Sequence, residues 1–395
     1  MDLKTKSKKN VLFVVDERRM GGVSVLLEDM MNMIDLNKYN IDILSLHNNG
    51  EMLENLPKGV NLIFGTPYFD AVDFTYQEVI KKHNFNLLLK KIQIVFDMKT
   101  NNIGKRIIRE RKKILNKKYD VEIAFKDGFT ALFTGFGDSK KKVHWLHYEY
   151  KKTNPNEKYD ALFKRVFQLF DEIVAVSNGV MEAFNALYNL EEKTHVIFNL
   201  VDTNKIMEKS REKCEVKLNN EDLNFVSVGR LHPMKGYDRL IKVINRIKEE
   251  KKLPDNFMLR IYGNGSMLTE LNELISKFQL DTHVKLMGQV MNPFKYLKNS
   301  DLFILCSSYE PFGLVMVEAM ATGVPVLATE NSATSRIIDN KKNGYIVENS
   351  EHGLYTGLIY LFSHLDELDK YKKNLKNYKY DNTKIIKQIE DVLDK

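Results

Sequence analysis

Short apolar runs rich in Val and Ile alternate along the chain with longer amphipathic stretches. An apolar run of this length suits a buried strand, and the stretches between runs are long enough for the helices that connect parallel strands. Before residue 201 the runs lie at 11–15, 41–46, 60–64, 121–125, 143–146, 173–176 and 195–198. After residue 222 they lie at 225–228, 258–262, 284–287, 302–305, 324–328 and 345–347. The pattern predicts an α/β protein with two doubly wound sheets, each in a Rossmann-like domain.

The length of 395 residues is too great for one ordinary core and suits two domains with a cleft between them. Apolar residues make up 43% of the chain, which excludes an intrinsically disordered protein. Residues 201–222 are polar and show no strand pattern, so we place the boundary there. We expect an N-terminal domain at 1–201, a C-terminal domain at 202–373, and a final helix within 374–395.

The composition indicates a reducing compartment. The chain has only two cysteines, Cys214 and Cys306, which is too few for a disulfide framework or a thiolate metal site. The apolar run that follows the basic N-terminus is too short for a signal peptide, and no run approaches the ~20 residues that span a bilayer. We therefore expect a cytoplasmic protein.

Two charged residues follow the first strand of the second domain. Arg230 and Lys235 lie five positions apart in the segment Val-Gly-Arg-Leu-His-Pro-Met-Lys-Gly. Because ligands bind outside the carboxyl ends of strands in open α/β sheets, these cations can converge on one anion, such as a phosphate group. The alternative is ordinary surface charge near a turn.

A glycine-rich turn follows the next strand, where Gly263 and Asn264 precede a predicted helix. Such a turn allows the backbone to approach a ligand closely, and it is equally a tight connection. It is not the dinucleotide fingerprint, because Leu268 stands where that pattern needs its third glycine. This disfavours a nicotinamide-linked oxidoreductase.

Residues 301–326 carry two glutamates at the end of a buried strand. Glu310 lies in the turn after the strand, and Glu318 lies one to two turns into an apolar helix. An unpaired carboxylate is costly in such surroundings, so both side chains suit hydroxyl groups of a ribose or a sugar; a solvated Glu318 is the alternative. The first amides of the helix can hold a diphosphate at the positive end of the helix dipole. These amides belong to Phe312, Gly313, Leu314 and Val315.

The first domain offers two further candidates at strand ends. Gly21 and Gly22 open a helix after the first strand, which suits close approach to a phosphate or a flexible connection. His147 follows the strand at 143–146, where it is a candidate for function or a packing residue. No two aspartates lie two positions apart and the nine histidines form no dense cluster, so we expect no metal ion.

Taken together, these segments resemble glycosyltransferase family 4, the retaining nucleotide-sugar transferases of the GT-B fold. The most specific match is Ser-x-x-Glu-Pro-Phe-Gly-x-x-x-x-Glu-Ala-Met-Ala-x-Gly-x-Pro-Val, and the Arg230 to Gly236 segment is the second. The resemblance implies two Rossmann-like domains that face each other across a cleft. It also implies that the helix in 374–395 packs back on the N-terminal domain.

The resemblance assigns roles to the candidate residues. It implies that Arg230 and Lys235 bind the donor diphosphate, Glu318 the ribose and Glu310 the transferred sugar. Gly22 would lie beside the phosphates, and His147 would touch the sugar from the other domain. The implied reaction is retaining transfer of a hexose from a nucleotide-diphosphate donor, a UDP-sugar, to a saccharide or lipid-linked acceptor in the synthesis of cell-surface polysaccharide, capsule or glycolipid. The leaving phosphate oxygen would take the proton.

Two other functions fit parts of the pattern. A non-hydrolysing sugar-nucleotide epimerase shares the fold and a diphosphate site. A nucleic-acid-binding protein would use the basic residues of 81–118, but one basic segment without base-stacking residues is a poor basis for it.

The segment 81–118 holds thirteen Lys or Arg residues against only Asp97 and Glu110. Its basic residues are mixed with apolar ones, which suits a helix that lies in the interface of an anionic membrane. The alternative is a core-packed helix with a solvated basic face. The first reading predicts a peripheral protein on the inner membrane face.

Overall fold

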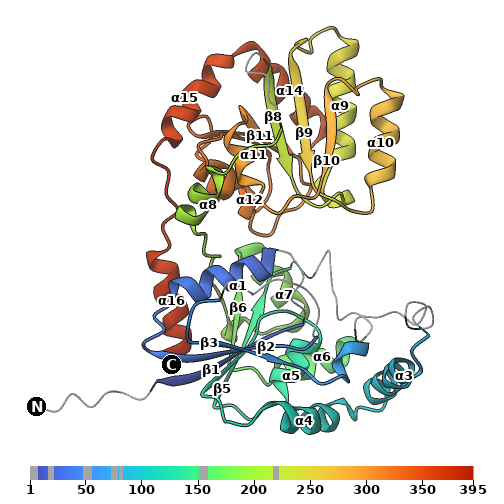
Figure 1. Ribbon diagram of the computed structural model, residues 1–395, viewed down its shortest axis with the longest axis vertical. Helices are drawn as coiled ribbons and strands as arrows, with labels where there is room; N and C mark the ends of the chain where they lie inside the picture. The colour runs from blue at the N-terminus through green and yellow to red at the C-terminus, as the bar shows by residue number, and fades with distance from the viewer. Residues whose placement is uncertain are drawn as a thin grey trace, which may run out of the picture. The chain divides into compact units, whose positions relative to one another are not determined.

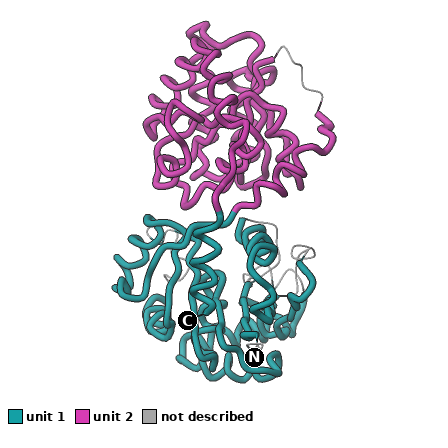
Figure 2. The backbone as a smooth tube through the Cα atoms, turned by 90° about the vertical axis from the view of Figure 1, so that its left-hand side faces the viewer, with its two compact units in different colours: residues 1–200, 382–395 teal, residues 201–381 magenta. Residues whose placement is uncertain are grey.

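The computed structural model describes residues 8–16, 22–47, 56–72, 79, 83–148, 150, 159–216 and 222–394. The chain forms two compact units (Figure 2). Unit 1 comprises Met1–Leu200 together with Asn382–Lys395, and unit 2 comprises Val201–Asp381.

Unit 1 contains a parallel sheet of seven described strands in the order β3-β2-β1-β4-β5-β6-β7. The strands are β1 (Lys9–Val15), β2 (Tyr39–Ser45), β3 (Val60–Phe64), β4 (Val121–Ala124), β5 (Lys141–Leu146), β6 (Glu172–Ala175) and β7 (Thr194–Val196). The helices and short 3-10 turns are α1 (Gly22–Met33), η1 (Phe69–Ala71), α3 (Phe85–Lys99), α4 (Ile103–Ile114), α5 (Phe129–Gly135), α6 (Asp160–Phe167), α7 (Asn178–Tyr188), η3 (Glu191–Lys193) and α16 (Thr383–Asp394).

Unit 2 contains a parallel sheet of six described strands in the order β10-β9-β8-β11-β12-β13. The strands are β8 (Leu223–Val228), β9 (Phe257–Tyr262), β10 (Val284–Gly288), β11 (Leu302–Leu305), β12 (Val326–Thr329) and β13 (Gly344–Val347). The helices and the 3-10 turn are α8 (Thr203–Ser210), η4 (Pro233–Lys235), α9 (Tyr237–Glu249), α10 (Leu268–Lys277), α11 (Phe294–Lys298), α12 (Leu314–Ala321), α13 (Thr334–Ile337), α14 (Glu351–Ser363) and α15 (Leu365–Leu375).

Each sheet reverses its strand order once, which defines where a ligand can bind. In unit 1 the reversal lies between β1 and β4, and in unit 2 it lies between β8 and β11. The connections from these neighbouring strands leave in opposite directions, so a crevice opens at their carboxyl ends. The prediction of two doubly wound Rossmann-like domains is confirmed (Figure 1).

The strands form because their sequences are apolar on both faces. All four residues of β11 and of β12 are buried, as expected for parallel strands covered by helices on each side. The helices contribute apolar stripes to the same core. In α9, for example, Leu240, Ile244 and Ile247 are buried and share one face.

Unit 2 begins at Val201, one residue from the predicted start at 202, whereas its C-terminal boundary differs from the prediction. Residues 201–222 contain α8, which packs against α11 and α12 within unit 2, so part of this stretch belongs to the domain itself. At the other end the division falls at residue 382 instead of 374. Residues 374–381 stay with unit 2 because α15 continues to Leu375, which is buried, and because Tyr380 bonds to Arg336.

The C-terminal helix α16 is part of unit 1 (Figure 1). Its apolar face, which includes Ile385 and Ile389, is buried. Its last turn is tied to the sheet by polar contacts: Lys141 Nζ donates to Val392 O at 2.7 Å, and Tyr39 Oη donates to Asp394 Oδ1 at 2.9 Å. Within the described residues, no helix has both the length and the apolarity needed to cross a membrane.

Candidate functional site

The turns after β8 and β9 lie against each other at the carboxyl edge of the unit 2 sheet. Gly263 has φ +150°, and a Cβ there would lie 1.9 Å from Gly229 O. Leu231 N donates to Asn264 O at 3.0 Å, which joins the two turns directly. Glycine is required at 263 because a side chain would force the two turns apart. The predicted Gly263–Asn264 turn therefore supports the segment that carries Arg230.

Lys235 is fixed at the end of η4, between β8 and α9. Gly236 follows it with φ +69°, and a Cβ at this position would lie 2.3 Å from Cys306 O. The Cys306 thiol donates to Lys235 O at 3.1 Å. The turn after β8 is thereby held against the end of β11. These two strands are the neighbours between which the strand order reverses.

Lys235 and Glu310 form an ion pair at this reversal of strand order. Lys235 Nζ lies 2.6 Å from Glu310 Oε2, and their side chains are 22% and 11% exposed. Ser307 Oγ lies 3.4 Å from the same carboxylate oxygen. The structure thus brings together two predicted residues that are 75 positions apart in sequence. Both charged groups are mostly removed from water. The attraction between them is therefore stronger than it would be in solvent.

The turn that carries Glu310 is held by residues that the sequence analysis did not identify. Arg239 Nε donates to Cys306 O at 3.0 Å, and Thr329 Oγ1 donates to Ser307 O at 2.8 Å. Ser332 Oγ donates to Glu310 O at 3.3 Å. Ser307 belongs to the Ser-x-x-Glu motif, so its spacing offered a signal. Arg239 lies within helix α9 and Thr329 within strand β12, and neither belongs to a motif that would have marked it.

The start of α12 presents the remaining predicted residues. Gly313 is the N-cap with φ +82°, and a Cβ there would lie 2.2 Å from Met316 Cε. Three residues of the helix are half-buried: Leu314, Val315 and Glu318. Val315 and Glu318 lie one and four positions after Leu314, which places all three on one face of the helix. The other α12 residues are buried. This face is consequently the part of α12 that a ligand can reach.

Phe312 differs from the other predicted residues in this group. Its ring is 3% exposed, with the Arg336 guanidinium 4.3 Å from its centroid and the Tyr380 ring at 6.4 Å. The side chain therefore packs the α12 turn against the 374–381 segment. Any ligand contact by this residue is left to its backbone.

Arg230 lies at the surface, in the turn after β8 and five positions before Lys235. It is exposed, and within the described residues it forms no ion pair or hydrogen bond through its side chain. Its guanidinium is thereby available for an anion.

The candidates of unit 1 lie at the carboxyl ends of β1 and β5. Gly22 is the first residue of α1 and is exposed, and Gly21 lies outside the described residues. His147 directly follows β5, is 6% exposed, and packs edge-on against Phe125 with ring centroids 4.9 Å apart. Its Nε2 is buried and has no hydrogen-bond partner among the described residues. Burial lowers the pKa of His147 to about 3, so the imidazole is neutral at pH 7.

Beside His147 lies a buried polar network that the sequence analysis missed. Asp127 Oδ1 lies 3.0 Å from His144 Nε2 and accepts a hydrogen bond from Tyr150 Oη. His144 is fully buried and stacks on Phe167. Each of these two histidines keeps one ring nitrogen without a partner among the described residues, Nδ1 in His144 and Nε2 in His147, but only His144 is bound to Asp127.

The buried His147 predicts a specific acid sensitivity of folding. Its folded-state pKa lies below the ordinary value of 6.5, so the unfolded chain binds the proton better and stability falls as pH drops from 6.5 toward 3. Between pH 7 and pH 5 this group should lower the free energy of unfolding by about 2 kcal/mol. In His147→Gln we expect the pH dependence to shrink by that amount, measured by urea unfolding at both pH values. The exposed His352→Gln is the control, and an unchanged pH dependence in His147→Gln would contradict the assignment.

No group of three or more His, Cys, Asp or Glu side chains suited to a metal ion occurs among the residues that the structure describes.

Comparison with known families decides how this site is classified. Residues 208–381, which contain the whole of the Lys235–Glu310 site, match the family described as glycosyl transferases group 1. The segment 208–381 belongs to the group 1 glycosyl transferases. This confirms the family resemblance predicted from the motifs at 230–236 and 307–326.

The relatives of this chain come from distant organisms. An uncharacterised glycosyltransferase of Methanocaldococcus jannaschii is 30% identical over 208 residues, which is 49% of either chain. The N-acetylgalactosamine-N,N'-diacetylbacillosaminyl-diphospho-undecaprenol 4-alpha-N-acetylgalactosaminyltransferase of Campylobacter jejuni is 29% identical over 232 residues, 58% of this chain and 60% of that protein. The chain thus spans about half to three fifths of the length of these two relatives.

A solved structure matches this chain over nearly its full length. HepE of Anabaena, crystallised with UDP and glucose, superposes with a TM-score of 0.73 at 18% identity, over 98% of this chain and 99% of that chain. The likeness supports the GT-B fold with two Rossmann-like domains.

Proposed function

We propose that this chain transfers a hexose from a UDP-sugar to a saccharide or lipid-linked saccharide acceptor, with retention of configuration and without a metal ion. The observation that carries the proposal is the Lys235–Glu310 pair at the strand-order reversal of unit 2, inside the family segment. A cation for the leaving diphosphate and a carboxylate for the sugar hydroxyls are needed next to each other in such a reaction. The pair supplies both.

The cations are proposed to bind the donor diphosphate. The backbone of Lys235 is held against the end of β11, and the ion pair with Glu310 places its ammonium. A diphosphate would compete with the Glu310 carboxylate for it, which would release Glu310 to accept hydrogen bonds from the sugar. Arg230, exposed and without an ion pair among the described residues, would add a second cation. Charge that grows as the glycosidic bond breaks is then met by both groups.

The α12 face is proposed to hold the nucleoside. Glu318 is half-buried on the same face as Leu314 and Val315, so its carboxylate can accept from both ribose hydroxyls. The first amides of α12 point out of the helix start and favour negative charge there. Gly313 at the N-cap keeps this helix start free of a Cβ. Gly22, at the start of α1 in unit 1, is proposed to approach the phosphates.

The names of relatives support the substrate classes. The HepE structure contains UDP and glucose, which favours a UDP-linked hexose as the donor. The C. jejuni relative is named for a diphospho-undecaprenol acceptor, which favours a lipid-linked saccharide and a role in cell-surface glycan synthesis. A cytoplasmic protein would meet both substrates at the inner membrane face.

The proposed chemical step needs no separate base. The bond from the anomeric carbon to the phosphate oxygen breaks, and the acceptor oxygen bonds to that carbon on the same face. The acceptor proton passes to the departing phosphate oxygen, so charge and atoms balance. His147, proposed to touch the transferred sugar, is neutral at pH 7 and would serve through hydrogen bonding.

A thermal-shift panel tests the donor site. UDP, GDP, ADP and their sugars are added with and without EDTA, because a ligand of the folded state raises its melting temperature. We expect a shift with UDP compounds that EDTA does not abolish. A shift only with added divalent metal would contradict metal independence, and no shift with any nucleotide would contradict the donor site.

A product assay then distinguishes transfer from epimerisation. We expect free UDP to appear only when a saccharide acceptor is present, and proton NMR to show the donor's anomeric configuration in the product. Conversion of the UDP-sugar to an epimer without acceptor would favour the epimerase instead. Inversion at the anomeric carbon would contradict the retaining mechanism.

A further inference from the structure

One side of α3 is an exposed apolar stripe. Phe85, Leu89, Ile92 and Phe96 are 70%, 48%, 50% and 60% exposed. Their spacing of four, three and four residues places them on one face of the helix. The opposite face, which includes Leu87 and Ile94, is buried in unit 1. This apolar stripe is therefore additional to the core-facing side of α3, and a contiguous exposed apolar patch of this kind marks an interaction surface.

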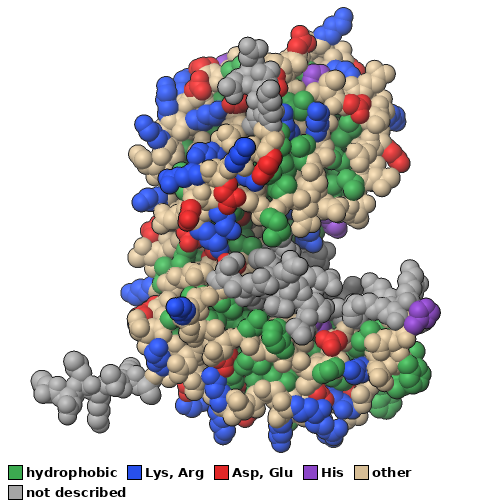
Figure 3. Space-filling model, in the orientation of Figure 1, with side chains coloured by type: hydrophobic (Ala, Val, Ile, Leu, Met, Phe, Trp, Pro, Cys, Tyr) green, Lys and Arg blue, Asp and Glu red, His purple; other side chains and the backbone are tan. Residues whose placement is uncertain are grey.

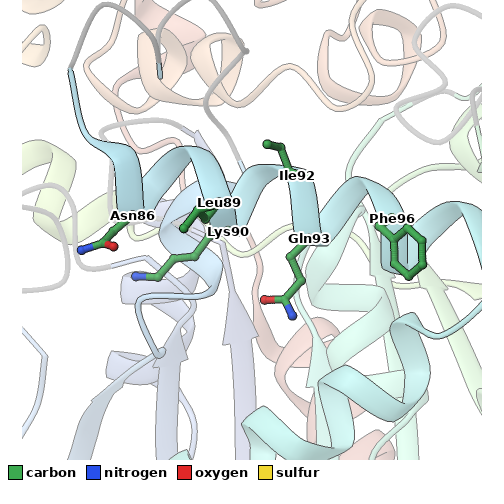
Figure 4. A pocket seen from close by; sticks show the side chains of 6 residues that line it. All are labelled: Asn86, Leu89, Lys90, Ile92, Gln93 and Phe96. Carbon is green, nitrogen blue, oxygen red and sulfur yellow. The ribbon is translucent and has the colours of Figure 1, made fainter.

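The surface at the stripe is shallow. It forms a hollow lined by Asn86, Leu89, Lys90, Ile92, Gln93 and Phe96 (Figure 4). All six residues belong to α3, so the hollow has a single described wall and cannot enclose a small molecule. Such a surface suits an extended, flat partner.

Positive charge lies beside the apolar stripe, at the end of α3 and on α4. Lys99, Lys105, Arg109 and Lys112 are exposed, and within the described residues none of them forms an ion pair. Hydrophobic side chains gather over α3, and Lys and Arg side chains gather over α4 beside it (Figure 3). The stripe and these four cations are called the α3–α4 surface below.

The acidic residues of these helices do not offset this charge. Asp97 is 7% exposed and its Oδ2 lies 3.1 Å from Arg106 Nε. Glu110 is 3% exposed and its Oε1 lies 2.7 Å from Lys113 Nζ. Both carboxylates are buried and already paired, so the exposed charge of α3 and α4 is entirely positive within their described residues.

We propose that the α3–α4 surface docks on a bilayer that contains anionic phospholipid. The stripe inserts its two phenylalanines and two aliphatic side chains between the lipid headgroups, and the cations contact the phosphate groups around it. At 15 residues α3 is shorter than the ~20 residues that span a bilayer, so it lies in the plane of the interface.

The sequence left two alternatives open for 81–118, and in the structure each of them fits a different helix. The α4 helix fits the core-packed alternative, because it buries Ile103 and Ile107 and exposes a basic face. The α3 helix fits the interfacial reading. The two helices pack together, so one supplies apolar contact and the other supplies charge.

Charge also argues against two other occupants. A second copy of the chain would bring its own uncompensated cations to the same surface, and like charges across an interface are unfavourable. A nucleic acid would satisfy the cations and leave four apolar side chains in water. A bilayer with anionic headgroups satisfies both parts of the surface.

Vesicle sedimentation with the full-length protein tests the apolar part. We expect wild type to bind phosphatidylglycerol–phosphatidylcholine vesicles and Phe85→Ser/Phe96→Ser to bind at least about 10²-fold more weakly, because two exposed rings no longer insert. Both rings are more than half exposed, so the fold should tolerate the change. Leu187→Ser/Leu365→Ser, which also removes two exposed apolar side chains, should bind like wild type.

Charge reversal tests the electrostatic part. Lys99→Glu/Lys105→Glu/Arg109→Glu should weaken binding to the anionic vesicles by about 10²-fold or more, and high salt should weaken the binding of wild type. The control Lys373→Glu/Lys376→Glu/Lys379→Glu changes three exposed lysines of unit 2 and the same net charge, and should retain binding.

Three results would overturn the proposal. They are no binding of wild type to anionic vesicles, equal weakening in variant and control, and a protein dimer that the Phe85→Ser/Phe96→Ser change dissociates in light scattering. The docking is independent of the proposed sugar chemistry. A nucleotide-induced thermal shift that persists in the α3 variants would show that the donor site is intact even if docking fails.

Discussion

Lys235→Ala is expected to lower kcat by about 10²- to 10³-fold, the cost of removing one positioned donor that stabilises developing charge. The ammonium lies at the reversal of strand order, 2.6 Å from Glu310 Oε2, where a leaving diphosphate would compete for it. Stabilisation of the transition state should suffer more than donor binding. Steady-state kinetics with a UDP-sugar and a saccharide acceptor measure kcat and KM separately.

The matched control for this variant is Lys242→Ala. Lys242 lies on α9 and is exposed, and among the described residues its only ion pair is with Asp238 at i,i+4, so its loss should leave kcat unchanged. Because Lys235→Ala leaves the Glu310 carboxylate without its cation, the melting temperature of each variant is measured alongside. Undiminished turnover in a folded Lys235→Ala protein would exclude the proposed role.

The sheets of both units could be predicted because each strand is an apolar run with two covered faces. Every predicted run corresponds to a strand, and β11 (Leu302–Leu305) has the predicted bounds. The candidate residues Arg230, Lys235 and Glu310 could be predicted because strand ends of parallel sheets converge at one edge. For these residues, a position directly after a strand is enough to predict their place at that edge of the sheet.

The pairing of Lys235 with Glu310 could not be predicted from the sequence. It depends on Gly236 allowing the chain to touch Cys306 O, and on Arg239 and Thr329 holding the turn that carries Glu310. The two hydrogen bonds join segments that are 22 and 67 residues apart. The periodicity of residues within one helix or strand does not predict such long-range contacts.

The polar composition of 201–222 concealed a helix, and the C-terminal boundary of unit 2 was predicted eight residues too early. The α8 helix is short and mostly polar, yet it buries Thr203, Ile206 and Ser210 against unit 2. A helix that needs only three buried residues leaves a weak periodic signal. At the C-terminus, tyrosine packing with Arg336 keeps 374–381 in unit 2, and no pattern within 374–395 marks that contact.

Glu318→Ala is expected to weaken UDP binding by about 10²-fold or more, since charge-assisted hydrogen bonds contribute about 1.5 to 3 kcal/mol each and a ribose offers two hydroxyls. The UDP-induced thermal shift should then disappear at concentrations that saturate wild type. Glu318→Gln should fall between the two, because its amide oxygen still accepts.

The α12 face gives this prediction its specificity. Glu318 shares that face with Leu314 and Val315, whereas Glu273 is exposed on α10 and lies outside the site, so Glu273→Ala should keep the full shift. If Glu318→Ala retains the shift while Lys235→Ala loses it, the diphosphate assignment stands and the ribose assignment fails. If both variants retain it, nucleotide binding does not use the carboxyl edge of β8 and β11, and the proposed function fails with it.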